Sequence, residues 1–190
     1  MSFDTSTGEI SGVPTIISPT TTYTITATNS GGSDTTQIQI TVNDEVPNIN
    51  YTSSDIVGTV NTPVNGIAAT NSGGDVVSWS VNPALPSGLT IDSAGVISGT
   101  PTVISPLTVY TVTATNTGGT STDTVTIQVN DVIPSLVSYD PSSFTETRDS
   151  SMTAVTPTSE GGTVVSWSID PALPTGINLD ATTGEISGTP

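Results

Sequence analysis

Two segments of the chain alternate hydrophobic and polar residues with a period of two. Residues 110–115 read YTVTAT, and residues 123–129 read DTVTIQV. Because successive side chains of a β-strand point to opposite faces, this alternation predicts two half-buried strands. The inner face of the second strand then carries Val125, Ile127 and Val129. The intervening NTGG at 116–119 tolerates positive φ, so the two strands are predicted to form a hairpin.

The rest of the chain shows the same β pattern, interrupted by loops. Residues 76–81 form a run rich in Val and Trp, and a second alternating segment places Ile38, Ile40 and Val42 on one face. Residues 83–88, PALPSG, are predicted to be a loop because proline donates no ladder hydrogen bond. No window combines helical periodicity with helix caps. The expected fold class is therefore all-β.

The pattern repeats along the chain. Residues 166–190 match the first half of residues 78–119, and residues 3–32 match the second half. The isoleucine of an Ile-Ser-Gly tripeptide recurs after 87 and then 89 residues, at Ile10, Ile97 and Ile186. A repeat of 87–89 residues suits one β-sandwich domain. The chain is therefore predicted to be a tandem array of such domains.

Three motifs of the repeat point to a known family. They are LPSGL at 85–89, ISGTP at 97–101 and YTVTATNTGG at 110–119. Together they resemble the immunoglobulin-like repeat of large bacterial surface proteins, a family related to cadherin-like and immunoglobulin-like sandwiches. The resemblance implies tandem immunoglobulin-like β-sandwich repeats that act as spacers or adhesive modules without catalytic residues.

The few aromatic residues also recur with the repeat. Tyr23 and Tyr110 take matching places near the start of a strand, where we expect a tyrosine corner with the hydroxyl group bonded to backbone. Trp79 and Trp167 lie within apolar segments. We therefore expect them to be core residues rather than exposed platforms for sugars.

Two matching hexapeptides mark the boundaries between repeats. VNDEVP at 42–47 and VNDVIP at 129–134 each follow an alternating strand and precede a new extended segment. They predict the C-terminal part of an immunoglobulin-like repeat at 1–44, a complete repeat at 45–131 and the N-terminal part of a repeat at 132–190.

The two partial repeats are complementary. Together they hold the strands of one sandwich, and they overlap because Ser2–Val13 and Asn178–Thr189 are equivalent. Half a sandwich leaves an apolar face and strand edges without partners. The missing half can come from another chain by strand complementation into a head-to-tail filament, from a longer polypeptide, or from a swapped dimer.

Composition narrows the range of partners. The chain has one Lys or Arg and 17 Asp or Glu, a net charge of −16, which excludes nucleic-acid binding because phosphates need cations. No segment is apolar enough for membrane insertion. The first residues, MSFDT, lack the features of a signal peptide, so an exported chain is expected to be a mature product or a fragment. The absence of cysteine excludes disulfides and favours a prokaryotic surface protein.

Catalytic chemistry is not expected. The chain has no His, Cys or Lys, so the residues of serine–histidine, cysteine–histidine and Schiff-base catalysis are missing. Paired carboxylates remain, as in glycoside hydrolysis. However, Asp4, Asp92 and Asp180 recur with the repeat, which is typical of a turn-capping aspartate. We therefore predict that the chain is not an enzyme and binds no organic cofactor.

The repeat boundaries suggest one metal site. Asn43 and Asp44, and again Asn130 and Asp131, are followed by a proline, an arrangement similar to a reduced cadherin linker motif. Carboxylate and amide oxygens are the ligands that Ca²⁺ prefers. The sequence thus predicts calcium at the linkers, with a simple turn between strands as the alternative.

The expected function is a non-catalytic structural or adhesive module of an extracellular repeat array or filament, with neighbouring copies of itself or of the same array as partners. The alternative is a carbohydrate- or protein-binding module that uses loops 82–88 and 170–176. These loops read NPALPSG and DPALPTG, and their similarity favours architecture over tailored recognition. The expected location is extracellular or at the cell surface of a prokaryote.

Overall fold

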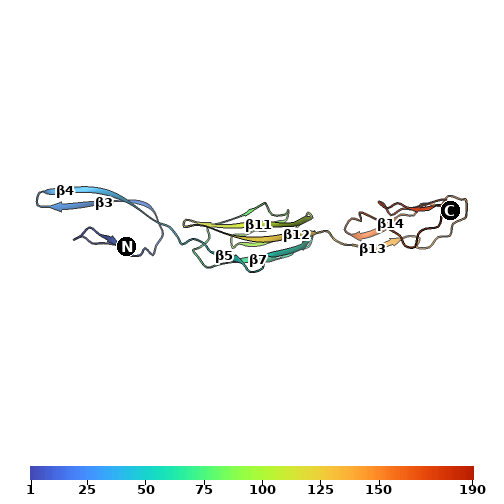
Figure 1. Ribbon diagram of the computed structural model, residues 1–190, viewed down its shortest axis with the longest axis horizontal. Coiled ribbons are helices and arrows are strands. Elements are labelled where there is room, and N and C mark those ends of the chain that lie inside the picture. Colours follow the sequence, from blue (N-terminus) through green and yellow to red (C-terminus); the bar gives the residue numbers. More distant parts are fainter. The chain divides into compact units, whose positions relative to one another are not determined.

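The computed structural model describes all 190 residues, and its regular structure consists only of β-strands. The chain divides into two compact units, Met1–Gln128 and Val129–Pro190. Figure 1 shows the order of their strands along the chain. The expected all-β class is confirmed. The structure has no helix with the length and hydrophobicity that a bilayer crossing requires.

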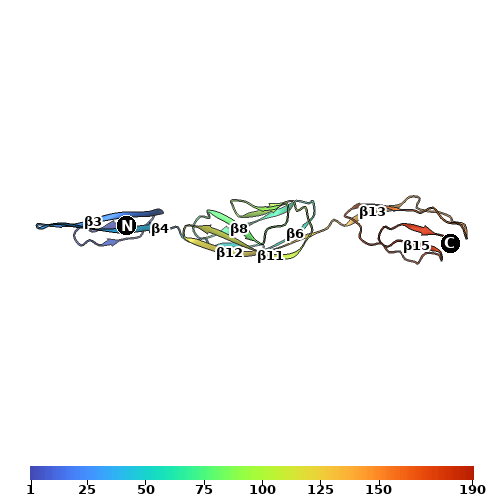
Figure 2. The same cartoon turned by 90° about the horizontal axis from the view of Figure 1, so that it is seen from above.

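The middle of the chain forms a sandwich of two four-stranded sheets (Figure 2). In hydrogen-bonded order, the first sheet comprises β5 (Ile49–Tyr51), β7 (Val64–Asn71), β10 (Val96–Gly99) and β9 (Leu89–Ile91). The second sheet comprises β6 (Asp55–Thr59), β12 (Gly119–Asn130), β11 (Ser105–Asn116) and β8 (Ser78–Asn82). The predicted hairpin β11–β12 therefore lies in the middle of its sheet, between β6 and β8.

The inward positions of these strands build the core of the sandwich. Val125, Ile127 and Val129 of β12 are at most 1% exposed, as the alternation predicts. On the neighbouring strand β11, Val112 and Ala114 are also fully buried. Burying a branched aliphatic side chain contributes about 1.5–3 kcal/mol, so these positions supply much of the stability of a sandwich with few aromatic residues.

Residues 1–44 contain four strands in two separate pairs. β1 (Ser2–Phe3) pairs with β2 (Ile10–Ser11), and β3 (Ser18–Asn29) pairs with β4 (Gly32–Val42) in a long hairpin. The hairpin β3–β4 is the sequence counterpart of β11–β12, but its outer edges have no strand partner. No residue in this part of the chain is buried.

The second unit contains counterparts of the first sheet of the sandwich. β13 (Pro134–Tyr139) pairs with β14 (Pro157–Gly161), and β15 (Ile177–Leu179) pairs with β16 (Ile186–Gly188). Its small core consists of Met152, Val155 and Ile186, with Tyr139, Leu173, Ile177 and Leu179 packed against it. The unit has no counterpart of the hairpin β11–β12.

The tyrosine prediction was wrong about which residues bond to backbone. The hydroxyl groups of Tyr51 and Tyr139, not those of Tyr23 and Tyr110, donate to a glycine carbonyl oxygen at 2.6 Å. Tyr51 lies on β5 and reaches the turn after β9, whereas Tyr110 lies on β11 and is buried. Strand position therefore decided the role, and alternation alone could not show it.

The tryptophans are half-buried rather than enclosed, so the core prediction holds only in part. A Cβ atom at Gly95 would lie 2.5 Å from the Trp79 ring, whose Nε1 donates to a backbone carbonyl oxygen at 3.3 Å. Trp167 lies in the same way over Gly184 and meets Tyr139 edge to face, with 6.4 Å between ring centroids. Both tryptophans hold a turn in place, and only glycine fits beneath their rings.

Candidate interaction site: the apolar face of the first hairpin

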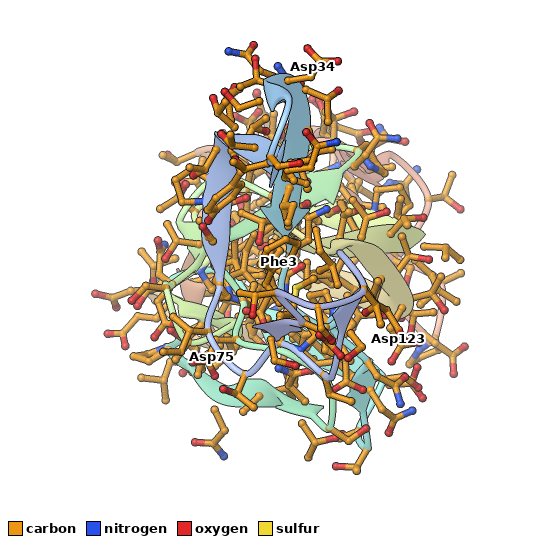
Figure 3. The ribbon with its side chains drawn as sticks, turned by 90° about the vertical axis from the view of Figure 1, so that its left-hand side faces the viewer. Phe3, Asp34, Asp75 and Asp123 are labelled. Atoms are coloured by element: carbon orange, nitrogen blue, oxygen red, sulfur yellow. The ribbon has the colours of Figure 1, made fainter.

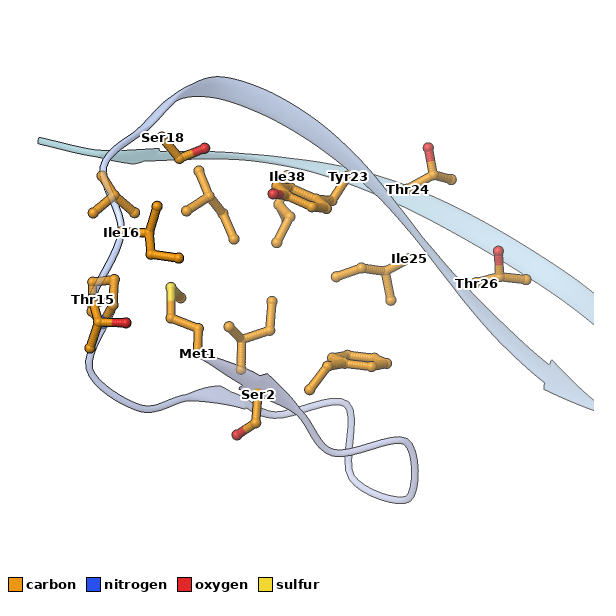
Figure 4. A pocket seen from close by; sticks show the side chains of 15 residues that line it. Met1, Ser2, Thr15, Ile16, Ser18, Tyr23, Thr24, Ile25, Thr26 and Ile38 are labelled. Carbon is orange, nitrogen blue, oxygen red and sulfur yellow. The ribbon is translucent and has the colours of Figure 1, made fainter.

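One face of the hairpin β3–β4 carries apolar side chains that are not enclosed. They are Tyr23, Ile25, Ile38, Ile40 and Val42. Together with Met1, Phe3 and Ile16 they line a cavity of about 550 Å³, and Met1 lies across this cavity from the hairpin (Figure 4). Met1 and Phe3 remain 56% and 46% exposed, so the segment before the hairpin covers this face only loosely.

The counterparts of these side chains are buried in the sandwich. Tyr110 is 4% exposed, whereas the matching Tyr23 is 46% exposed. Ile127 is fully buried, whereas the matching Ile40 is only half-buried. The same hairpin sequence therefore has two environments within one chain.

The strands that flank the hairpin in the sandwich have no counterpart in residues 1–44. β8 pairs with β11 over Thr111–Thr115, and β6 is hydrogen-bonded to β12. The hairpin β3–β4 forms a two-stranded sheet on its own. Its edges are thus open to strand addition, in the manner of an unprotected sheet edge.

Sequence counterparts of the flanking strands occur in the second unit. Residues 166–170, SWSID, correspond to β8, SWSVN, and residues 143–147 correspond to β6. Neither segment forms a strand there. Apolar side chains in and beside these segments are exposed, namely Val165 at 83%, Ile169 at 45% and Phe144 at 39%.

At the tip of β11–β12, the side chain of Asn116 holds the linker that precedes the sandwich. Its Nδ2 donates to the carbonyl oxygens of Glu45 and Asp75 at 2.6 and 3.2 Å. Its Oδ1 accepts from the N–H groups of Gly118 and Gly119 at 2.8 and 3.1 Å. Sequence reasoning treated this tip as a turn only. The recurrence of the motif as NSGG at 29–32 is the sequence signal that could have indicated that Asn116 also binds the linker.

Two glycine loops allow the linker to approach closely. A Cβ atom at Gly118 would lie 2.1 Å from the carbonyl oxygen of Asp44, and one at Gly74 would lie 2.1 Å from that of Glu45. The N–H of Asp44 donates to Oγ1 of Thr117 at 3.1 Å. The linker therefore packs between two loops, and each loop needs a glycine where it meets a carbonyl oxygen of the linker.

The residues of the predicted calcium site lie in separate linkers. Asp44 and Asp131 each accept the N–H of the following residue through Oδ1 at 2.8 Å, which is the turn-forming use of an aspartate. Asn43 and Asn130 are exposed. No group of three or more His, Cys, Asp or Glu side chains comes together in the structure. Calcium at these linkers stays a prediction.

The recurring aspartates cap turns. Oδ1 of Asp4, Asp92 and Asp180 each accepts two backbone N–H groups from the turn that follows. The pKa of the Asp4 carboxyl is lowered below 3.8, first by the hydroxyl of Ser6, and that of Asp180 is lowered first by the N–H of Thr182. Each of these carboxylates therefore stabilises the turn in which it lies.

The negative charge is distributed over the surface and is largely unpaired. Asp34 and Asp75 are exposed, and Figure 3 labels both. Asp123 is half-buried and accepts the N–H of Tyr51 at 2.6 Å. The salt bridge between Arg148 and its neighbour Asp149 joins two exposed side chains at 3.4 Å. Two copies of this chain therefore repel one another at long range.

Comparison with known proteins agrees with the geometry. The model of the family described as "Putative Ig domain" matches residues 1–43, 46–130 and 134–190. The chain is 34% identical over 188 residues to the serine-rich adhesin for platelets of Staphylococcus aureus strain MRSA252. That alignment covers 90% of this chain and 12% of the adhesin, so the chain corresponds to a small part of that protein.

Solved structures that the chain is similar to include a "putative alpha-galactosidase" from Bacteroides fragilis NCTC 9343, with 31% identity and a TM-score of 0.38 over 47% of this chain and 18% of that one. They also include human CDH23 EC21-23, with 19% identity and a TM-score of 0.40 over 88% of this chain and 66% of that one. Because the family model matches nearly every residue, the chain belongs to the "Putative Ig domain" family, with three matched segments in tandem.

Proposed function

We propose that this chain is a non-catalytic structural and adhesive module of an extracellular repeat array of a bacterium. Three matched segments of one immunoglobulin-like family support an array, and the similarity to an adhesin supports an adhesive role outside the cell. The site described above offers apolar surface and strand edges rather than reactive groups. Such a site is suited to binding another protein segment.

In this role, residues 1–44 of one copy and residues 132–190 of another complete each other by strand complementation. The observation that carries this proposal is the hairpin pair. One hairpin is buried between β6 and β8, whereas the other is only loosely covered, and the counterparts of β6 and β8 form no strand in the second unit. Each copy can therefore donate a hairpin at one end and accept one at the other, which assembles the array head to tail.

The apolar face and the strand edges contribute differently to this assembly. Burial of an exposed apolar side chain contributes about 1.5–3 kcal/mol, and four of the five side chains of this face gain less because they are already half-buried in the monomer. Association costs roughly 4–15 kcal/mol in lost freedom of motion, so the apolar face alone does not offset that cost. Strand pairing at both hairpin edges must supply the surplus, against repulsion between copies of net charge −16.

Analytical ultracentrifugation and electron microscopy of the purified 190-residue chain test the assembly. We expect linear oligomers that lengthen with protein concentration and with added salt, because salt screens the repulsion. An Ile40→Asp variant should remain monomeric with an intact sandwich. Strictly monomeric particles of the unaltered chain, at high concentration and high salt, would contradict complementation.

A further inference from the structure

We propose that the hairpin tip at residues 29–32 holds the linker around Val132 of a second copy, with the side chain of Asn29 as the central contact. This inference rests on the strand complementation proposed above. The contact between the tip of one copy and the linker of the other is called the joint below.

The template for this contact is Asn116, which is the counterpart of Asn29. Asn116 is 8% exposed, and both of its Nδ2 bonds go to backbone carbonyl oxygens around the linker. Asn29 is exposed, and its Oδ1 already accepts the N–H of Gly31 at 2.8 Å. The first tip thus has the turn of the second, and its Nδ2 group has no partner within the chain. A free donor in a preformed turn is suited to an incoming carbonyl oxygen.

The linker that would bind the tip already has the required shape in the second unit. A Cβ atom at Gly162 would lie 1.8 Å from the carbonyl oxygen of Val132, just as Gly74 approaches Glu45 in the sandwich. The N–H of Gly162 donates to the carbonyl oxygen of Ile133 at 3.5 Å, and the matching bond of Gly74 measures 3.4 Å. The glycine loop on one side of the linker is therefore in place. The asparagine tip on the other side is missing from this unit.

Correspondence with the sandwich sets the contacts of the joint. Nδ2 of Asn29 donates to the carbonyl oxygens of Val132 and Thr163, which match Glu45 and Asp75. Gly31 lies against the carbonyl oxygen of Asp131, as Gly118 does against Asp44. All of these contacts are made by residues of the hairpin tip, and none depends on the strands behind it.

The same correspondence sets the strand register behind the tip. In the sandwich, Val112 pairs with Val81 and Ala114 pairs with Trp79. The joint therefore pairs Ile25 with Ile169 and Ala27 with Trp167 of the second copy. A shift by one residue would turn the apolar side chains of the hairpin to solvent, so the tip and the register support each other.

Two full-length variants isolate a single joint. Ile40→Asp disrupts the apolar face of the hairpin β3–β4, and Ile169→Asp disrupts the strand segment that receives this hairpin in another copy. Each variant should therefore be monomeric alone, and a mixture of the two should form one-to-one pairs. The Kd of this pair is measured by sedimentation or fluorescence titration. Introducing Asn29→Ala into the chain with the intact hairpin should raise the Kd about 5- to 100-fold, the loss expected for two hydrogen bonds.

Two further variants distinguish the contact with the second copy from the role of Asn29 in its own turn. Asn29→Asp keeps the Oδ1 acceptor for Gly31 and loses the donor, so it should weaken pairing as Asn29→Ala does. Ser33→Asp adds the same charge to the same hairpin beyond the tip, and we expect it to change the Kd less than twofold as a charge control. Unaltered Kd values for both Asn29 variants would overturn this inference and leave complementation standing. Absence of any pairing between the two parent variants would overturn both.

Discussion

The hairpins β3–β4 and β11–β12 share almost the same sequence, with YTITATNSGG in one and YTVTATNTGG in the other, yet only the second is buried. Both consist of two neighbouring, hydrogen-bonded strands joined by an asparagine-glycine tip. Strand pairing is local, because the alternation and the tip encode it within about 25 residues. Burial is not local, because it depends on which other strands are present.

The difference also separates the two regions in stability. A two-stranded hairpin is marginal in water unless further strands or an apolar layer cover it. β11–β12 has a strand on each side and a second sheet against its face, whereas β3–β4 has only the loose cover of the preceding segment. Residues 1–44 are therefore expected to open at far lower free energy than the sandwich.

The largest expected effect comes from matched core substitutions. Ile127→Ala should lower the free energy of unfolding of the sandwich by about 2–5 kcal/mol, because it leaves a cavity among fully buried neighbours. Ile40→Ala in the dilute monomer should cost less than about 1 kcal/mol, because Ile40 borders a cavity already. Urea unfolding followed by Trp79 fluorescence in a Trp167→Phe background measures the first loss, and hydrogen exchange measures the second. Equal losses would remove the distinction between the hairpins.

Glycine substitutions at the tips should show the same contrast. Gly118→Ala should destabilise the sandwich by about 1–3 kcal/mol, because its Cβ atom would lie 2.1 Å from the Asp44 carbonyl oxygen. Gly31→Ala should leave monomer stability nearly unchanged, because its Cβ atom would meet only Oδ1 of Asn29 at 3.3 Å. Thermal unfolding of the two variants compares them. A large loss for Gly31→Ala would mean that the first tip is already as tightly enclosed as the second.

Removal of residues 1–13 should strengthen association severalfold. Ser2–Val13 and Asn178–Thr189 are sequence equivalents, so in a complemented sandwich β15–β16 would take the place that β1–β2 hold in the monomer. The N-terminal segment thus competes with the partner for the apolar face. Sedimentation of the truncated and unaltered chains compares their Kd values. Weaker association of the truncated chain would show that the segment contributes to the joint instead.

Alkaline pH should weaken the sandwich through Tyr51. Burial, and then the negative charges of Asp123 and Asp92, raise the pKa of Tyr51 to about 12. Because the folded pKa lies above the ordinary value of 10, the contribution of the neutral hydroxyl is complete below pH 10 and is lost as pH rises through 12. Denaturation midpoints across this range should fall for the unaltered chain and fall less for Tyr51→Phe. Parallel curves for the two proteins would exclude Tyr51 as the cause.

Calcium should have the smallest effect. If Asn43, Asp44, Asn130 and Asp131 bind the ion, the melting midpoint rises in calcium relative to chelator. We expect only a small rise, because Asp44 and Asp131 already accept backbone N–H groups. A double variant, Asp44→Asn with Asp131→Asn, should lose any such rise, whereas either change alone should remove only part of it. Identical midpoints in calcium and chelator would leave both aspartates as turn residues.

Sequence pattern predicted much of the fold and less of the site. Alternation located Val125, Ile127 and Val129 in the core, and the motif at 116–119 located the hairpin. The side-chain role of Asn116 was missed, because a tip asparagine looks the same whether or not a linker passes beside it. The bonding tyrosine was misplaced for a related reason, because the glycine carbonyl that Tyr51 reaches lies 44 residues away in the sequence.

The sequence by itself determined the strands, the repeat, the family motifs and the charge of this protein, because each arises from residues close together in the chain. Only the tertiary structure decided which of two equivalent hairpins is buried and which is only loosely covered. Strands β6 and β8 and the opposite sheet supply that burial, and they come from parts of the chain far from the hairpin in sequence. Apolar burial is a property of neighbours in space, so two nearly identical segments can differ in stability and in the partners that they accept.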